Sequence, residues 1–94
     1  GRTRDVINLP DGKVFTPRLI DDTLAGIPGL AQYVCVQERA DSIRVDYVSA
    51  GPRDIGRDIE SRLNSIWETT RIAARAVPFI TPEPSGKYRT AVPL

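Results

Sequence analysis

The sequence predicts an α+β domain in which two helices pack on a small, mainly antiparallel sheet, with the order β-β-α-β-β-α-β. Apolar and polar residues alternate over residues 43–47, which is the two-residue period of a half-buried strand. Apolar residues recur every three or four positions over residues 55–66, which is the period of an amphipathic helix. Segments rich in β-forming residues and separated by turn signals surround these two patterns, which favours strands and helices in one layered domain.

A hairpin is predicted at the start of the chain. Residues 6–9 are a short apolar segment, and residues 13–15 can form the return strand. The Pro-Asp-Gly sequence between them is a strong turn signal, with Gly12 as the turn glycine.

The first helix is predicted to begin at Thr16 and Pro17. The hydroxyl of Thr16 can accept hydrogen bonds from free backbone N–H groups, and Pro17 suits the first helical position because its missing N–H costs nothing there. One apolar face is formed by Ile20, Leu24 and Ile27. We interpret Asp21 and Asp22 as early-helix residues that the helix dipole favours.

Two strands and a second helix follow. Residues 30–37 are rich in β-forming residues and predict a strand with both faces at least partly covered, and residues 43–47 predict a strand with one buried face. Gly51 helps to end the second of these strands. Residues 55–66 predict the clearest helix of the chain.

The segment at residues 69–80 fits either a continued helix or a strand. Threonine and isoleucine favour a strand, whereas the three alanines also suit a helix. We place a strand within residues 71–80, and Pro78 indicates that its last part lies at a sheet edge. Residues 81–86 carry two prolines and a glycine and predict a loop.

Composition excludes several kinds of function. Thirteen basic and twelve acidic residues nearly cancel, so charge gives no reason to expect nucleic acid or an anionic membrane as the partner. There is no histidine, and Cys35 is the only cysteine, so neither an internal disulfide nor a zinc site built from Cys and His is possible. We predict no metal site, and we interpret Cys35 as a small core residue.

The length of 94 residues is that of one domain. The sequence contains no methionine, so we expect a piece of a longer protein. We also expect a cytoplasmic location, because no apolar run approaches the length of a membrane span and no segment resembles a signal peptide.

Three segments, in this order, carry a family resemblance. Residues 1–7, Gly-Arg-Thr-Arg-Asp-Val-Ile, look like a hinge motif of the form Gly-Arg-x-Asp-Asp. Residues 12–21 are similar to Gly-x-x-apolar-x-Pro-x-x-Ile-Glu, and residues 85–89 look like Ser-Gly-Lys-aromatic-Arg. Together they resemble the C-terminal lid domain of adenylate-forming ligases of the phenylacetate–coenzyme A ligase type, which include relatives linked to capsular polysaccharide biosynthesis.

The resemblance implies that residues 1–94 are one lid domain of a larger ligase. The full enzyme would activate a small-molecule carboxylate with ATP, form an acyl-adenylate, and then form a thioester with coenzyme A. An N-terminal adenylation domain would be the partner, and it would provide most of the contacts to ATP and Mg²⁺. This chain alone would then bind no cofactor and have no activity.

The resemblance also assigns roles to individual residues. Lys87 corresponds to the catalytic lysine, whose cation stabilises charge on the reacting carboxylate and phosphate. Arg2 matches the arginine near the ATP ribose and phosphates. The other motif positions are the hinge and loop residues Arg4, Asp5, Gly12 and Gly86. Arg4 stands where the family usually has aspartate or lysine.

An alternative function is a non-enzymatic module that binds a small ligand or dimerises through its sheet. Lys87 would then be a solvated lysine at a loop tip, and Gly12 would be no more than a turn glycine. Tyr33, Tyr47 and Trp67 are interpreted as core or rim aromatics in either case.

Overall fold

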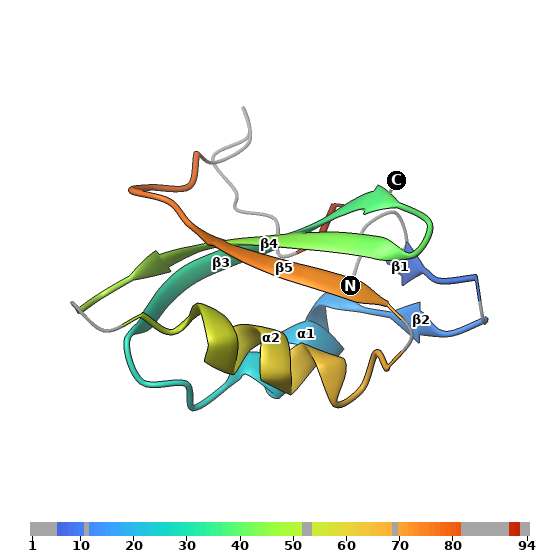
Figure 1. The fold of residues 1–94 in the computed structure, drawn as a ribbon, viewed down its shortest axis with the longest axis horizontal. Helices are drawn as coiled ribbons and strands as arrows, with labels where there is room; N and C mark the ends of the chain where they lie inside the picture. The colour runs from blue at the N-terminus through green and yellow to red at the C-terminus, as the bar shows by residue number, and fades with distance from the viewer. Residues whose placement is uncertain (1–5, 11, 52–53, 69, 82–90, 93–94) are drawn as a thin grey trace.

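The computed structural model describes residues 6–10, 12–51, 54–68, 70–81 and 91–92 of the chain. Its elements are β1 (Ile7–Asn8), β2 (Val14–Phe15), α1 (Pro17–Leu24), β3 (Leu30–Arg39), β4 (Ser42–Ser49), α2 (Gly56–Asn64), β5 (Arg71–Ala76) and β6 (Ala91–Val92). Both helices lie on the same face of the larger sheet (Figure 1). The predicted α+β class and the order of the first seven elements are confirmed, and β6 is an addition that the sequence pattern did not indicate.

The larger sheet is mixed, which differs from the mainly antiparallel sheet that we predicted. Its four strands run in the order β5-β4-β3-β6, and β1 and β2 form a separate two-stranded sheet. The β3–β4 pair is antiparallel because a tight turn joins the two strands. The β4–β5 pair is parallel, because α2 crosses over between them and returns the chain in the same direction. The β3–β6 pair is also parallel.

The β1–β2 hairpin has the predicted turn. Leu9 N donates to Lys13 O at 2.9 Å, and Gly12 N donates to Leu9 O at 3.0 Å. Gly12 has φ of +88°, a left-handed conformation that a residue with a Cβ rarely adopts. Gln37 Nε2 then donates to Asn8 O at 2.9 Å, which fixes the hairpin to the end of β3.

Helix α1 begins as predicted, because the Thr16 hydroxyl accepts a hydrogen bond from Leu19 N at 3.2 Å and Pro17 occupies the first turn. The interpretation of Asp21 and Asp22 as early-helix residues is wrong. The first turn of α1 contains no acidic residue, and both side chains belong to the second half of the helix. Asp21 instead accepts a hydrogen bond from the Tyr33 hydroxyl, which connects α1 to β3.

One apolar core lies between the helices and the sheet. Ile20 and Leu24 contribute to it from α1, and Ile59 and Leu63 contribute from α2, all with 2% or less of their surface exposed. From the sheet, alternate residues of β4 point inward, so that Ile43, Val45 and Tyr47 are buried. Arg44 and Asp46 therefore lie on the opposite face. No helix formed by the described residues has the length and apolar character that crossing a bilayer requires.

Candidate functional site

Most of the residues that the motif resemblance singled out lie outside the described residues. These are Arg2, Arg4 and Asp5 near the start of the chain, and Gly86 and Lys87 near its end. Gly12 is described, and it occupies the tip of the β1–β2 hairpin, where a Cβ would meet nothing within 4 Å. Its positive φ alone accounts for a glycine at this position.

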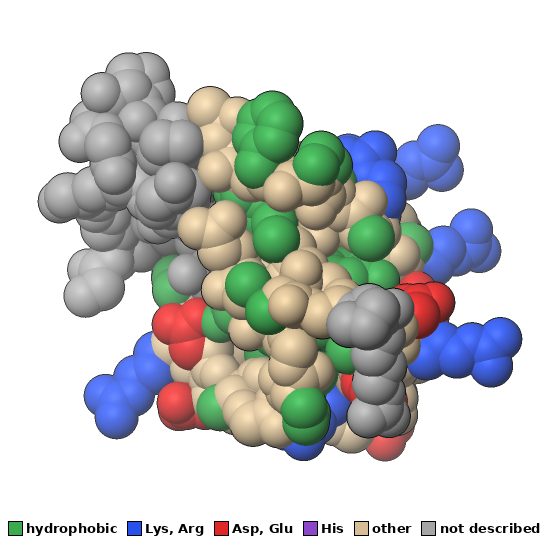
Figure 2. Space-filling view, turned by 90° about the vertical axis from the view of Figure 1, so that its left-hand side faces the viewer, with side chains coloured by type: hydrophobic (Ala, Val, Ile, Leu, Met, Phe, Trp, Pro, Cys, Tyr) green, Lys and Arg blue, Asp and Glu red, His purple; other side chains and the backbone are tan. Residues whose placement is uncertain are grey.

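A polar hollow of about 570 Å³ lies between the start of α2, the end of β4 and β5. Its lining includes Tyr47, Asp54, Arg57, Glu60 and Ala74. Figure 2 shows the end of the molecule that lies at the left of Figure 1, where apolar side chains are interspersed with polar surface and charged side chains lie mainly toward the edges. The hollow is open and polar, unlike the apolar clefts that typically enclose small ligands.

The carboxylate of Asp54 joins β4 to the start of α2. Its Oδ1 accepts hydrogen bonds from Gly56 N at 3.0 Å and from the Tyr47 hydroxyl at 3.2 Å. A Cβ on Gly56 would lie 3.0 Å from the Tyr47 oxygen, so this close approach favours glycine at position 56. The backbone N–H of Gly56 and the Tyr47 hydroxyl hold the pKa of Asp54 below its usual value. Burial, and then the bond to Asp54, raises the pKa of Tyr47.

Glu60 joins α2 to β5 on the other side of the hollow. Its Oε2 accepts a hydrogen bond from Ala74 N at 2.9 Å. Asp54 and Glu60 are thus both engaged with backbone groups of their own fold, which is a structural use of a carboxylate. The described residues contain no group of three His, Cys, Asp or Glu side chains that could hold a metal ion.

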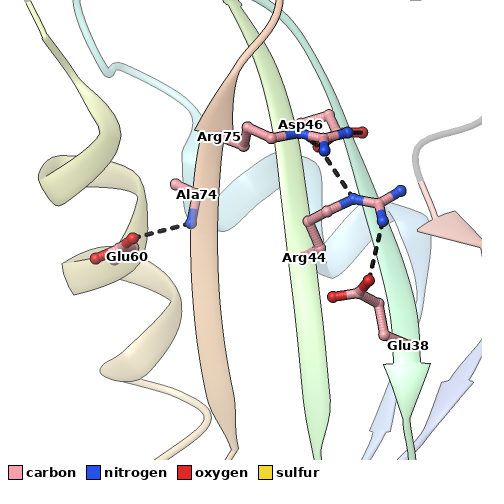
Figure 3. A network of polar contacts seen from close by, with 6 residues as sticks. All are labelled: Glu38, Arg44, Asp46, Glu60, Ala74 and Arg75. Atoms are coloured by element: carbon pink, nitrogen blue, oxygen red, sulfur yellow. Dashed lines mark hydrogen bonds and ion pairs between the residues drawn. The ribbon is translucent and has the colours of Figure 1, made fainter.

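On the face of the larger sheet opposite α1 and α2, a cluster of charged side chains connects β3, β4 and β5 (Figure 3). Arg44 Nη1 lies 3.0 Å from Glu38 Oε2, and Arg44 Nε lies 3.1 Å from Asp46 Oδ1. Arg75 contacts both oxygens of Asp46, with Nε 3.1 Å from Oδ1 and Nη2 3.2 Å from Oδ2. The Asp46 side chain is 13% exposed, so its carboxylate is the shielded centre of the cluster. The sequence placed Arg44 and Asp46 on one strand face, but nothing local indicated Arg75 as their partner.

Asp46→Asn should lower the free energy of unfolding by about 1–3 kcal/mol, because it weakens charge-assisted hydrogen bonds to two guanidinium groups. Urea unfolding followed by circular dichroism measures this loss.

The matched control is Asp22→Asn. Its carboxylate lies 4.0 Å from Arg18 Nε, and both side chains are more than 70% exposed. The control should change stability by less than about 0.5 kcal/mol. Equal effects of the two substitutions would show that the Asp46 cluster is only a solvated surface ion pair.

Cys35 is a core residue, as predicted. It is fully buried in β3, and burial raises the pKa of its thiol to about 12. A thiol with so high a pKa carries almost no thiolate near neutral pH and is a poor nucleophile. Trp67 and Tyr47 are buried, and Tyr33 is half-buried against α1, so the interpretation of the aromatics as core or rim residues is also confirmed.

Comparison with known proteins shows that nearly all of the chain resembles a domain of known structure. No protein-family model matches the sequence, and no curated protein matches it. Among solved structures, the chain is similar to the crystal structure of a domain of phenylacetate-coenzyme A ligase from Bacteroides vulgatus ATCC 8482. It superposes with a TM-score of 0.66 at 19% sequence identity, and the match covers 97% of this chain and 93% of that one. The two chains share one fold.

This likeness extends over nearly all of both chains, so the shared fold is that of the entire solved domain and not of one supersecondary motif. The region that would hold the predicted catalytic lysine lies outside the described residues. The hollow beside α2 and the charged cluster around Asp46 are features of this chain that the motif resemblance did not indicate.

Proposed function

We propose that this chain is the C-terminal lid domain of an ATP-dependent ligase that activates a carboxylate as an acyl-adenylate. The observation that carries the proposal is the fold match, over nearly the full length, to a domain of phenylacetate-coenzyme A ligase. Three sequence segments with the family's hinge, helix-entry and lysine motifs, at residues 1–7, 12–21 and 85–89, support the same assignment. The motifs concern three short segments, whereas the fold match concerns the topology of nearly the whole chain.

In this proposal the lid supplies charge and movement, and the N-terminal adenylation domain binds the substrates. Lys87 places its ammonium group against the reacting carboxylate and phosphate oxygens, where negative charge develops. Arg2 contacts the nucleotide substrate, and Arg4 and Asp5 form the hinge, where large changes of φ and ψ are concentrated. Gly12 and Gly86 are the loop positions of the helix-entry and lysine motifs. Coenzyme A would accept the acyl group after the lid rotates.

The described residues are consistent with a nucleotide site that lies mainly in another domain. Three polar side chains that line the hollow beside α2 are engaged within the fold: the Tyr47 hydroxyl donates to Asp54, and Glu60 accepts from the backbone N–H of Ala74. No glycine-rich phosphate loop precedes either described helix. The 94 residues alone are therefore expected to fold without activating a carboxylate.

A pyrophosphate-release assay tests the proposal with two proteins. The full-length product of the encoding gene should release pyrophosphate from ATP when a panel of carboxylic acids is supplied, and the 94-residue chain alone should stay at background. Circular dichroism of the isolated chain confirms that its inactivity is not caused by misfolding. Turnover by the isolated chain, or no carboxylate-dependent release by the full-length protein, would contradict the lid assignment. The second result would favour the non-enzymatic module.

A further inference from the structure

Among the described strands, β5 is an edge strand of the larger sheet, and half of its backbone groups point away from its neighbour β4. Arg71 N donates to Asp41 O and Val77 N donates to Tyr47 O, both at 2.9 Å, so odd-numbered positions of this segment point toward β4. Because strand backbone groups alternate in direction, the N–H and C=O groups of Ile72, Ala74 and Ala76 point outward. Such an edge is a template on which another strand can pair.

One side chain of helix α2, that of Glu60, contacts the middle of this edge (Figure 3). Glu60 Oε2 accepts the outward N–H of Ala74 at 2.9 Å, and the contact is partly buried. Among the described residues, no other side chain accepts a hydrogen bond from the outward groups of β5. The Glu60 side chain thus accepts a hydrogen bond from the central N–H group of the edge, which an incoming strand would otherwise need as its donor.

No strand of the described residues pairs with the outward side of β5. Ala73, Ala74 and Ala76 have small side chains that leave the backbone accessible. Arg75, which would otherwise repel its counterpart in a second copy, is paired with both oxygens of Asp46. Two β5 edges that meet about a twofold axis near Ala74 would form an antiparallel pair and extend the sheet across both chains.

We propose that Glu60 is an edge cap, which prevents β5 from pairing with the β5 of a second copy of this chain. The proposal rests on the described sheet edge alone and is independent of the ligase assignment. It requires the side chain at position 60 to reach Ala74 N and to offer it an oxygen acceptor. Charge on that side chain is not the requirement.

Three substitutions of Glu60 in the 94-residue chain distinguish the contributions of side-chain reach, the oxygen acceptor and charge. Glu60→Ala removes the acceptor, and Glu60→Asp keeps the charge but shortens the reach by one methylene group. Both should self-associate in sedimentation experiments, with an apparent mass about twice that of the monomer. Glu60→Gln keeps the reach and an oxygen acceptor, so it should stay monomeric like the parent chain. Circular dichroism checks the fold of each variant, and Glu60→Asp decides the question if Glu60→Ala does not fold.

Amide hydrogen exchange locates the contact. In the parent chain the Ala74 amide should exchange more slowly than that of Ala76, which faces the same edge, and this difference should disappear in Glu60→Asp. In an associated variant, the Ala76 amide should gain protection. A folded Glu60→Asp variant that stays monomeric at every concentration would overturn the proposal. So would association without new protection along β5, because the copies would then meet at another surface.

Discussion

If the full-length protein is the proposed ligase, Lys87→Ala should slow acyl-adenylate formation by a factor on the order of 10²–10³, corresponding to about 3–4 kcal/mol. The expected loss follows from the proposed role of Lys87, which is to stabilise negative charge that develops in the first half-reaction. Single-turnover kinetics measures each half-reaction separately, with synthetic acyl-adenylate supplied for thioester formation. The second half-reaction should remain close to the parent rate, because the lid would by then present a different face.

The chain offers a matched control for this substitution, because Lys13 and Lys87 are its two lysines. Lys13 lies on the hairpin, and its Nζ donates to Ile66 O at 3.4 Å. Lys13→Ala removes the same charge and side chain from an exposed surface contact and should leave both half-reactions near the parent rate. Equal losses in both half-reactions for Lys87→Ala, or no loss in either, would contradict the catalytic assignment.

Trp67→Ala should lower the free energy of unfolding of the 94-residue chain by about 3–5 kcal/mol. Trp67 follows α2, is 1% exposed, and packs edge-to-face on Phe15 with the ring centroids 3.9 Å apart. The substitution would leave a cavity where the β1–β2 hairpin meets the second helix. A domain of this size is typically stable by about 5–15 kcal/mol, so the loss is a large part of the total. Urea unfolding must be followed by circular dichroism, since Trp67 is the only tryptophan.

Trp67→Phe is the control that separates ring packing from the indole N–H. The Nε1 atom of Trp67 is buried and has no hydrogen-bond partner among the described residues. Phenylalanine removes this unsatisfied donor and retains an aromatic ring against Phe15, so its cost should be clearly smaller than that of alanine. If the two variants lose the same stability, the contribution of Trp67 does not come from filling the core.

The local signals in the sequence predicted much of the fold. Thr16 and Pro17 define the start of α1, and Gly12 defines the hairpin turn, because each depends on backbone geometry within a few residues. The alternation at residues 43–47 correctly gave the buried face of β4. The strand within residues 71–80 was correctly placed, although its alanines equally suited a helix. The strand β6 has two residues and gave no periodic signal.

The candidate site was less predictable, for two different physical reasons. The assignments of Lys87, Arg2 and the hinge residues depend on motif resemblance, and the chemistry proposed for them would involve a second domain. The hollow at the start of α2 depends on contacts between residues separated in sequence. No local sequence pattern predicts the hydrogen bond between Tyr47 and Asp54, because it forms only when β4 and α2 pack together.

The sequence by itself determined most of the secondary structure and the inward faces of β4 and the two helices, because turn geometry and hydrophobic periodicity act over short distances. The tertiary structure alone decided how the strands pair. The crossover through α2 makes β5 parallel to β4, and that register brings Arg75 to Asp46 across 29 residues. The crossover also places Glu60 of α2 where its carboxylate accepts a hydrogen bond from the outward N–H of Ala74. Such pairs depend on strand direction, register and helix packing together, and no local pattern encodes that combination.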